Sequence, residues 1–186
     1  MKLLLLSLCL GLAWALQDQS QVPVQLGFCP EQVAGPWQTI KLGATNRSVI
    51  EDGGAYLCFM TGIQILANGN LNVTYFHRKD GNCVKEYYIA EKTDIPGRYT
   101  FEYEGQIYLT FVFVSNIAAI IDLENHSESG ILTVVELHGR TWFVDKQGLE
   151  AYREHTSRRG IPQRNIVNLL ASRKLPSIIL KNGHKC

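Results

Sequence analysis

The chain has 186 residues, of which 46% are hydrophobic, and its 18 Lys and Arg nearly balance its 17 Asp and Glu, giving a formal net charge of +1. This balance argues against nucleic acid or an anionic membrane surface as a partner, because both require clustered basic side chains that displace counterions. The length fits one domain with a sizeable hydrophobic core.

The first residues have the pattern of a secretory signal peptide. Lys2 is followed by an apolar run over residues 3–16, interrupted only by a serine and a glycine, and Ala13-Trp14-Ala15 supplies a small-x-small cleavage site. The run is too short for a transmembrane helix, which needs about 20 residues. We therefore expect a secreted, extracellular protein without stable membrane insertion, in which residues 1–15 are removed and residues 16–186 form a single domain.

Export to an oxidising compartment allows disulfide bonds and glycosylation. The cysteines that remain after cleavage are Cys29, Cys58, Cys83 and Cys186. Four cysteines permit three complete pairings. The glycosylation candidates are the asparagines of three Asn-x-Ser/Thr sequons, Asn46, Asn72 and Asn125.

Residues 35–140 have the pattern of short strands separated by turns. The expected strands are 36–43, two long strands within 53–82 that fold about Asn68-Gly69-Asn70, then 83–93, 97–105, 106–114, 118–124 and 131–140. Several of them alternate large apolar residues with polar ones, so one face must line an interior. Eight consecutive strands with short links predict an antiparallel up-and-down β-barrel, wide enough to be filled by side chains or to hold one small ligand.

The pattern changes from strand to helix after Arg140. Residues 145–159 predict a C-terminal amphipathic helix packed outside the barrel, with Leu149, Tyr152 and Thr156 on one face. Residues 165–169 predict a short final strand, and residues 170–186 form a tail without a clear period.

Motifs for metal or cofactor chemistry are lacking in the sequence. The five histidines have no ligand spacing with each other or with cysteine. Neither a Gly-x-Ser-x-Gly motif nor a Gly-rich phosphate loop with lysine occurs. We therefore expect no metal and no cofactor.

Five motifs in this order resemble the lipocalins, especially those that carry odorants and pheromones in mammalian secretions. They are Gly35-Pro36-Trp37, VIEDGG before the second strand, Gly81-Asn82-Cys83, ELHGR at the end of the eighth strand, and GIPQRNIVNL after the helix. The resemblance covers nearly all of the chain after the leader. Two features depart from it, namely Val114-Ser115-Asn116 where the family often has Thr-Asp-Tyr, and a long tail.

The resemblance implies roles for several residues outside the pocket. Gly35 opens the first strand, Trp37 closes the bottom of the barrel, and Arg140 lies over the tryptophan ring. It also favours a Cys83–Cys186 disulfide, while Cys29–Cys186 stays as a competing pair.

The resemblance also sets the phase of the second strand, and alternation then gives the residues that face the interior. The inward phase resumes after a one-residue slip at Gly62. The expected ligand-binding residues are Tyr56, Cys58, Met60, Ile63, Leu71, Val73, Tyr75, Tyr88, Ala90, Phe101, Tyr103, Leu109, Phe111, Ile121, Leu123, Val134, Glu136 and His138.

The polar residues of this set that could orient a ligand are Tyr75, Tyr88, Tyr103, Glu136 and His138. A lone inward carboxylate such as Glu136 must find a partner or take up a proton. His138 lies two residues along the same strand, where same-face neighbours are about 7 Å apart, so we expect it to be a partner only at some distance.

Cys58 has three interpretations, a disulfide, an inert wall residue or a nucleophile. A bond to Cys29 is disfavoured because Cys29 precedes Trp37 and lies near the closed end. One lipocalin, the lipocalin-type prostaglandin D synthase, is similar in having a free cysteine on this strand. In that enzyme hydroxyl groups surround the thiol, whereas here Met60 stands two residues further along. An apolar environment disfavours the thiolate, so we expect a wall residue.

The resulting functional expectation is a secreted, non-enzymatic carrier of a small hydrophobic ligand such as an odorant, pheromone, retinoid, steroid or fatty-acid-like molecule. The alternatives are a prostaglandin-D-synthase-like isomerase that uses Cys58, and a signalling lipocalin that acts through its surface. A monomer or weak homodimer, and a cell-surface receptor, are compatible with each.

Overall fold

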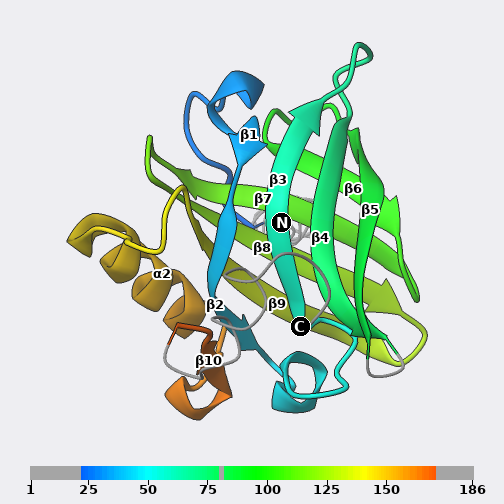
Figure 1. Cartoon of the computed structure of the whole chain (residues 1–186), viewed down its shortest axis with the longest axis vertical. Coiled ribbons are helices and arrows are strands. Elements are labelled where there is room, and N and C mark those ends of the chain that lie inside the picture. The colour runs from blue at the N-terminus through cyan, green and yellow to red at the C-terminus, as the bar shows by residue number, and fades with distance from the viewer. Residues whose placement is uncertain (1–21, 80–81, 171–186) are drawn as a thin grey trace, which may run out of the picture.

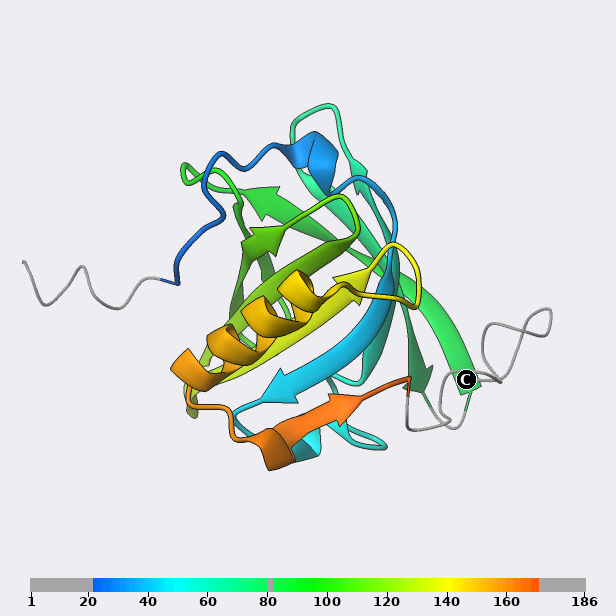
Figure 2. The ribbon, with the colours of Figure 1, turned by 90° about the vertical axis from the view of Figure 1, so that its left-hand side faces the viewer.

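The computed structural model describes residues 22–79 and 82–170. The predicted signal peptide and nearly all of the predicted tail therefore lie outside the described residues. Within the described ranges, the strands form one curled antiparallel sheet with a helix packed against its outer surface (Figure 1 and Figure 2).

Seven strands of the described chain follow one another, and each pairs antiparallel with the next. They are β3 (Cys58–Ile65), β4 (Leu71–Lys79), β5 (Asn82–Lys92), β6 (Arg98–Glu102), β7 (Gln106–Val114), β8 (Ala118–Ser127) and β9 (Gly130–Gly139). The short links between them are the hairpin turns that the sequence predicts.

The first strand closes this series into a barrel. It occurs as two pieces, β1 (Gly35–Pro36) and β2 (Gln38–Ala44), on either side of Trp37. β1 pairs with β3 and β2 pairs with β9, so the divided strand joins the two ends of the series. The prediction of an eight-stranded up-and-down barrel is therefore confirmed. A tenth strand, β10 (Ile166–Asn168), pairs with β2 beyond the barrel proper.

Register shifts bend the barrel at defined positions. The pairing of β3 with β4 shifts between Met60 and Gly62, where the sequence predicts a slip. A second shift lies between Thr39 and Lys41 of β2. Extra residues of this kind increase the local bend and twist of a strand, which a small closed barrel requires.

The closed end of the barrel is built around Trp37. This side chain is only 2% exposed, and its indole N–H donates to the Val33 carbonyl at 2.7 Å. The Arg140 guanidinium lies 3.7 Å from the ring centroid and donates to the carbonyls of Pro36 and Gln32. The predicted stacking of Trp37 and Arg140 is therefore present, a cation–π contact worth about 0.5–2 kcal/mol.

The helix α2 (Lys146–Arg158) starts at Asp145, whose carboxylate accepts the Gly148 N–H at 2.9 Å. Such a cap satisfies one of the free donors at a helix N-terminus. Tyr152 is buried beneath the helix and donates to the Val135 carbonyl at 3.2 Å. Figure 2 shows the helix lying along the outside of the sheet.

The buried face of α2 differs from the prediction. Leu149 is 38% exposed, whereas Gly148, Tyr152, His155 and Thr156 are buried. A Cβ atom at Gly148 would lie 2.8 Å from Val144 and 3.1 Å from Ala118. The absence of a side chain at this position therefore lets the helix approach the sheet on that side, and Leu149 is turned outward.

A buried ionic cluster fastens the end of α2 to the outer face of β8. The Asp122 carboxylate is fully buried and lies 2.6 Å from His155 Nε2 and 3.0 Å from Arg159 Nε. Arg159 also donates to the Glu124 carboxylate and to the Thr133 hydroxyl. The charge of Asp122 is thus compensated by the Arg159 guanidinium, and His155 adds a hydrogen bond.

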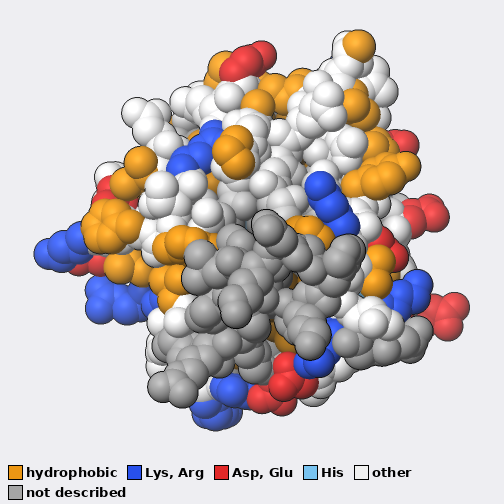
Figure 3. All heavy atoms as spheres, viewed as in Figure 1, with side chains coloured by type: hydrophobic (Ala, Val, Ile, Leu, Met, Phe, Trp, Pro, Cys, Tyr) orange, Lys and Arg blue, Asp and Glu red, His pale blue; other side chains and the backbone are white. Residues whose placement is uncertain are grey.

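Three short 3-10 turns complete the described fold: η2 (Pro30–Gln32), η3 (Arg47–Ile50) and η4 (Gln163–Asn165). Figure 3 shows charged side chains of both signs around the margin of one face. Within the described ranges, no helix combines the length and the apolar content that a membrane crossing requires.

Candidate functional site

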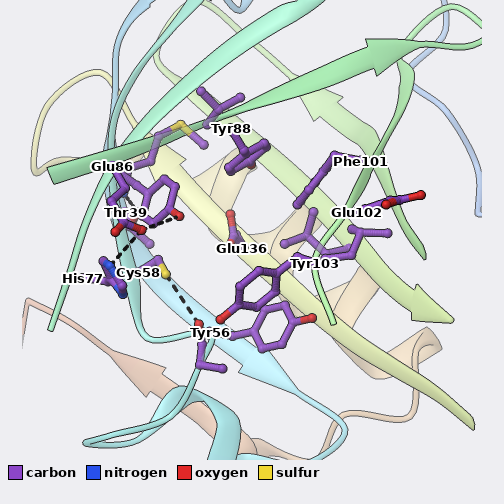
Figure 4. A pocket seen from close by; sticks show the side chains of 16 residues that line it. Thr39, Tyr56, Cys58, His77, Glu86, Tyr88, Phe101, Glu102, Tyr103 and Glu136 are labelled. Atoms are coloured by element: carbon purple, nitrogen blue, oxygen red, sulfur yellow. Dashed lines mark hydrogen bonds and ion pairs between the residues drawn. The ribbon is translucent and has the colours of Figure 1, made fainter. Parts of the chain in front are cut away.

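A cavity lies inside the barrel, near the end where β3 begins and β6 ends (Figure 4). The centres of water-sized spheres can occupy about 110 Å³ of it. One water needs about 10–15 Å³ by this measure, so the cavity has room for several waters or for one small organic molecule.

Many of the residues predicted to face a ligand line this cavity. They are Tyr56, Cys58, Met60, Val73, Tyr75, Tyr88, Phe101, Tyr103, Leu123 and Glu136. They come from β3 to β6, β8, β9, the loop before β3 and the turn after β6, which the barrel brings to one end of its interior.

The remaining predicted residues do not line the cavity. They are Ile63, Leu71, Ala90, Leu109, Phe111, Ile121, Val134 and His138, each 5% exposed or less. These side chains pack against one another inside the barrel, so the part of the interior that they occupy is filled rather than hollow.

Six cavity residues were missed by the sequence prediction: Thr39, Ala55, His77, Glu86, Glu102 and Ile107. His77, Glu86 and Ile107 continue the same alternation as predicted residues on their strands, and this signal could have found them. Thr39 lies at the β2 register shift, where simple alternation fails, and its hydroxyl accepts the Met60 N–H at 2.8 Å.

The loop between β2 and β3 is fixed to the opposite rim of the cavity. The Tyr56 N–H donates to the Val49 carbonyl within this loop at 2.8 Å. Across the rim, Asn125 Nδ2 donates to the Tyr56 hydroxyl at 2.7 Å and to the Tyr103 carbonyl at 3.0 Å. The rings of Tyr56 and Tyr103 meet edge to face, with centroids 5.8 Å apart. One buried amide therefore joins the two sides of the rim.

The three sequon asparagines have different surroundings. Asn46 is exposed, and its side-chain oxygen accepts the Ser48 N–H and hydroxyl at the start of η3. Asn72 is half-buried on β4. Asn125 is only 6% exposed, and the nitrogen that a glycan would occupy is the atom bound to Tyr56 and Tyr103.

Glu136 is the most buried carboxylate of the cavity. It is 8% exposed, and Figure 4 shows its carboxylate directed into the middle of the space. Its Oε2 lies 2.9 Å from His138 Nε2. The expectation that His138 would be a distant partner is therefore wrong, because both side chains lean along the strand and meet.

A second polar group occupies the wall formed by β4 and β5. Glu86 Oε2 lies 3.1 Å from His77 Nε2 and 3.5 Å from the Tyr75 hydroxyl. Glu86 Oε1 is 4.0 Å from the Lys79 ammonium, so this carboxylate has basic groups beside it. Burial, with smaller contributions from Cys58 and Glu86, raises the pKa of Tyr75 to about 12.

Aromatic rings form much of the remaining wall. Tyr88 stacks on Phe101 with ring centroids 4.1 Å apart, and Tyr75 lies 5.7 Å from Tyr88. Burial, followed by the charge of Glu136, raises the pKa of Tyr88 well above its usual value. Tyr88 is therefore neutral at physiological pH and acts as a neutral hydrogen-bonding group.

Cys58 is a free thiol in the cavity wall. Its sulfur lies 3.7 Å from the Ala55 carbonyl. Burial, followed by the charges of Glu136 and Glu86, raises its pKa to about 12. A thiol protonated at neutral pH is a poor nucleophile, so the geometry favours the wall interpretation.

The other cysteines divide into one free thiol and one bonded sulfur. Cys29 is free and exposed, so the competing Cys29–Cys186 pair is wrong. Cys83 is in a disulfide bond. Its predicted partner Cys186 lies outside the described residues, and this pairing stays a prediction. No group of three or more His, Cys, Asp or Glu that could hold a metal occurs among the residues described.

Comparisons with known proteins place this architecture in a family. The model of the lipocalin / cytosolic fatty-acid binding protein family matches residues 34–172. The salivary lipocalin of the pig, Sus scrofa, is 30% identical over 172 residues, covering 91% of this chain and 89% of the relative. Major urinary protein 20 of the mouse, Mus musculus, is 28% identical over 171 residues, covering 91% and 94%.

A solved structure gives the same result. The possum milk whey lipocalin trichosurin, determined with bound 4-ethylphenol, superposes with a TM-score of 0.68 at 27% identity, over 73% of this chain and 95% of trichosurin. The barrel order, the Trp37–Arg140 stack and the family match therefore agree, and the chain belongs to the lipocalin / cytosolic fatty-acid binding protein family.

Proposed function

We propose that this lipocalin is an exported carrier that takes up one small hydrophobic molecule in its barrel cavity. The observation that carries the proposal is the cavity inside the barrel, lined by Met60, Val73, Leu123 and several aromatic rings, with a few polar groups among them. Ligand pockets in proteins typically combine an apolar wall with a small number of polar groups that orient the ligand. Trichosurin, which holds 4-ethylphenol in its solved structure, supports a ligand of this size class.

The affinity in this proposal comes mainly from burial. Apolar surface removed from water contributes about 25 cal/mol per Å². The cavity is already formed by the folded barrel, so a ligand loses its own freedom but does not have to order the wall. The sequence-predicted residues that line the cavity are proposed as its contacts.

The isomerase alternative has less support. A nucleophilic cysteine requires thiolate character from a nearby cation or hydrogen-bond donors. Here the charges that act on Cys58 are the carboxylates of Glu136 and Glu86, which oppose ionisation. We therefore propose a binding role for Cys58 as part of the wall.

Displacement of a neutral fluorescent probe, N-phenyl-1-naphthylamine, by small alcohols and aldehydes tests the carrier proposal. The variant Leu123→Phe adds an aromatic ring to a cavity residue that is 5% exposed. We expect it to weaken ligand binding by about tenfold or more, equivalent to about 1.4 kcal/mol.

The matched control is Ile131→Phe on β9, where the side chain is 61% exposed and outside the cavity lining. It should bind like the parent. Failure of the parent to bind the probe or any of the small molecules would reject the carrier proposal.

Export, the disulfide and the assembly state complete the proposal. Relatives named urinary and salivary proteins support secretion. We expect cleavage after residue 15, a Cys83–Cys186 bond, and a monomer or weak homodimer. Mass spectrometry of the secreted protein, with and without reduction, checks the cleavage site and the disulfide bond. Sedimentation checks the assembly state.

A further inference from the structure

The charge around the cavity is unbalanced. The cavity lining includes the carboxylates of Glu86, Glu102 and Glu136. It also includes the imidazole ring of His77. No Lys or Arg among the described residues lines it. Glu86 has His77 and Lys79 beside it, and Glu102 is exposed at the rim, so the buried and uncompensated group is Glu136.

The partner of Glu136 supports its negative charge. His138 Nε2 faces the carboxylate at 2.9 Å, while His138 Nδ1 is buried without a hydrogen-bond partner. A proton on Nδ1 would be a buried donor without an acceptor, which is rarer and more costly than a buried lone pair. The ring proton therefore belongs on Nε2, where a neutral histidine donates it to the Glu136 carboxylate.

The second buried carboxylate of the described chain provides an internal reference. Asp122 lies 3.0 Å from the Arg159 guanidinium, which compensates its charge within the fold. Its other partner, His155, resembles His138 in having a buried Nδ1 without a hydrogen-bond partner. Glu136 has no such cation. Its second oxygen has no hydrogen-bond partner in the described residues and is directed into the cavity (Figure 4). A buried ionised group without a compensating charge is costly, and a bound cation relieves that cost.

The aromatic rings around the Glu136 carboxylate also favour a cationic ligand. The Tyr88–Phe101 stack and the Tyr56–Tyr103 pair belong to the lining of the cavity into which Glu136 points (Figure 4). Ring faces attract ammonium groups electrostatically, and the attraction grows when the cation is removed from water. The charge of Glu136 also acts on the nearest rings, because it is the largest contribution after burial to the raised pKa of Tyr88.

We propose that the cavity selects small apolar molecules that carry one protonated amine, with the ammonium bound to Glu136 between the aromatic rings. This inference rests on the proposed carrier function and names its ligand class. The ammonium donates a charge-assisted hydrogen bond to the free carboxylate oxygen. The apolar remainder packs against Met60, Val73 and Leu123.

Three ligands of nearly equal size test the inference in the unmodified protein: 2-phenylethylamine, 2-phenylethanol and phenylacetate. Their dissociation constants are measured by titration calorimetry at neutral pH. We expect the cationic amine to bind about ten- to a hundredfold more tightly than the neutral alcohol, an advantage of about 1.4–2.8 kcal/mol. The anionic phenylacetate should bind most weakly of the three.

The variant Glu136→Gln assigns this preference to one side chain. Glutamine keeps an oxygen that accepts from His138 but removes the charge, so the ratio of amine to alcohol affinity should fall to near one. Binding of the alcohol by the variant shows that its cavity is intact. The control Glu91→Gln makes the same charge change at an exposed residue of β5 outside the cavity lining, and should retain the parent ratio.

Two outcomes separate the inference from the carrier proposal. If the unmodified protein binds the alcohol as tightly as the amine, or Glu136→Gln keeps the amine preference, the amine inference is overturned while the carrier proposal stands. If none of the three ligands and no neutral probe binds, the carrier proposal itself fails. The comparison in the unmodified protein decides the point even if the variant does not fold.

Discussion

The two ends of the barrel interior are constructed on different principles. At the closed end, the polar atoms of Trp37 and Arg140 are all engaged with carbonyl groups or with a ring face. At the open end, one carboxylate oxygen of Glu136 faces the cavity without a hydrogen-bond partner among the described residues. The Cys58 sulfur makes only a long contact to the Ala55 carbonyl. The polar side chains at the closed end thus have hydrogen-bond partners within the fold, whereas those at the open end remain available to a ligand.

This difference separates stability from binding. Side chains that fill space and complete their hydrogen bonds contribute to folding, and their removal leaves cavities or unpaired groups. Side chains that line a preformed hollow contribute little packing energy, and their polarity decides what can enter. Substitutions at the two ends should therefore produce different kinds of effect.

The largest loss of stability is expected at the closed end. Trp37→Ala should lower the free energy of unfolding by about 3–5 kcal/mol, because a fully buried indole is replaced by a void. Urea denaturation measures the change. Phe143→Ala, at a side chain that is 70% exposed, is the matched aromatic truncation and should stay within about 0.5 kcal/mol of the parent. Equal stability of Trp37→Ala and the parent would contradict the closed-end assignment.

A large difference in thiol reactivity is expected at the open end. With the pKa of Cys58 at about 12, its thiolate fraction at pH 8 should be about a thousandfold below that of an ordinary cysteine. Alkylation by iodoacetamide, followed by peptide mapping, should therefore modify the exposed Cys29 well before Cys58. In denaturant both should react readily. Labelling of Cys58 at the rate of Cys29 in the folded protein would show that the thiol is activated and would revive the isomerase hypothesis.

The smallest expected effect concerns the rim of the cavity. Tyr56→Phe removes the hydroxyl that accepts from Asn125, while Asn125 keeps its bond to the Tyr103 carbonyl. The free energy of unfolding should fall by about 0.5–1.5 kcal/mol, the usual contribution of one hydrogen bond. Tyr87→Phe, at a tyrosine that is 67% exposed, should have almost no effect. If the two variants were equally stable, the rim bond would contribute nothing.

The sequence predicts the architecture well because strand alternation and turn residues are local properties. The order of the barrel strands, the slip near Gly62 and the Trp37–Arg140 stack follow from patterns and from the family resemblance, and the structure contains all of them. The division of the first strand at Trp37 was not predicted, because it depends on that strand pairing at both ends of the series.

The extent of the hollow could not be predicted from alternation. Ile107 and Leu109 are two residues apart on the same strand, yet Ile107 lines the cavity and Leu109 is packed away from it. Which position borders empty space depends on how side chains from several strands fill the centre, and no single strand contains that information. The contact between Glu136 and His138 was missed for a related reason, because Cα spacing along a strand does not show how two long side chains lean.

The location of Cys58 has a consequence for maturation in an oxidising compartment. Thiol–disulfide exchange requires a thiolate, and the surroundings of Cys58 in the cavity wall disfavour that form. Once the barrel has folded, the Cys58 thiol therefore reacts slowly with the disulfide bond of Cys83. The cavity wall that contacts a ligand therefore also keeps Cys58 out of disulfide exchange during secretion.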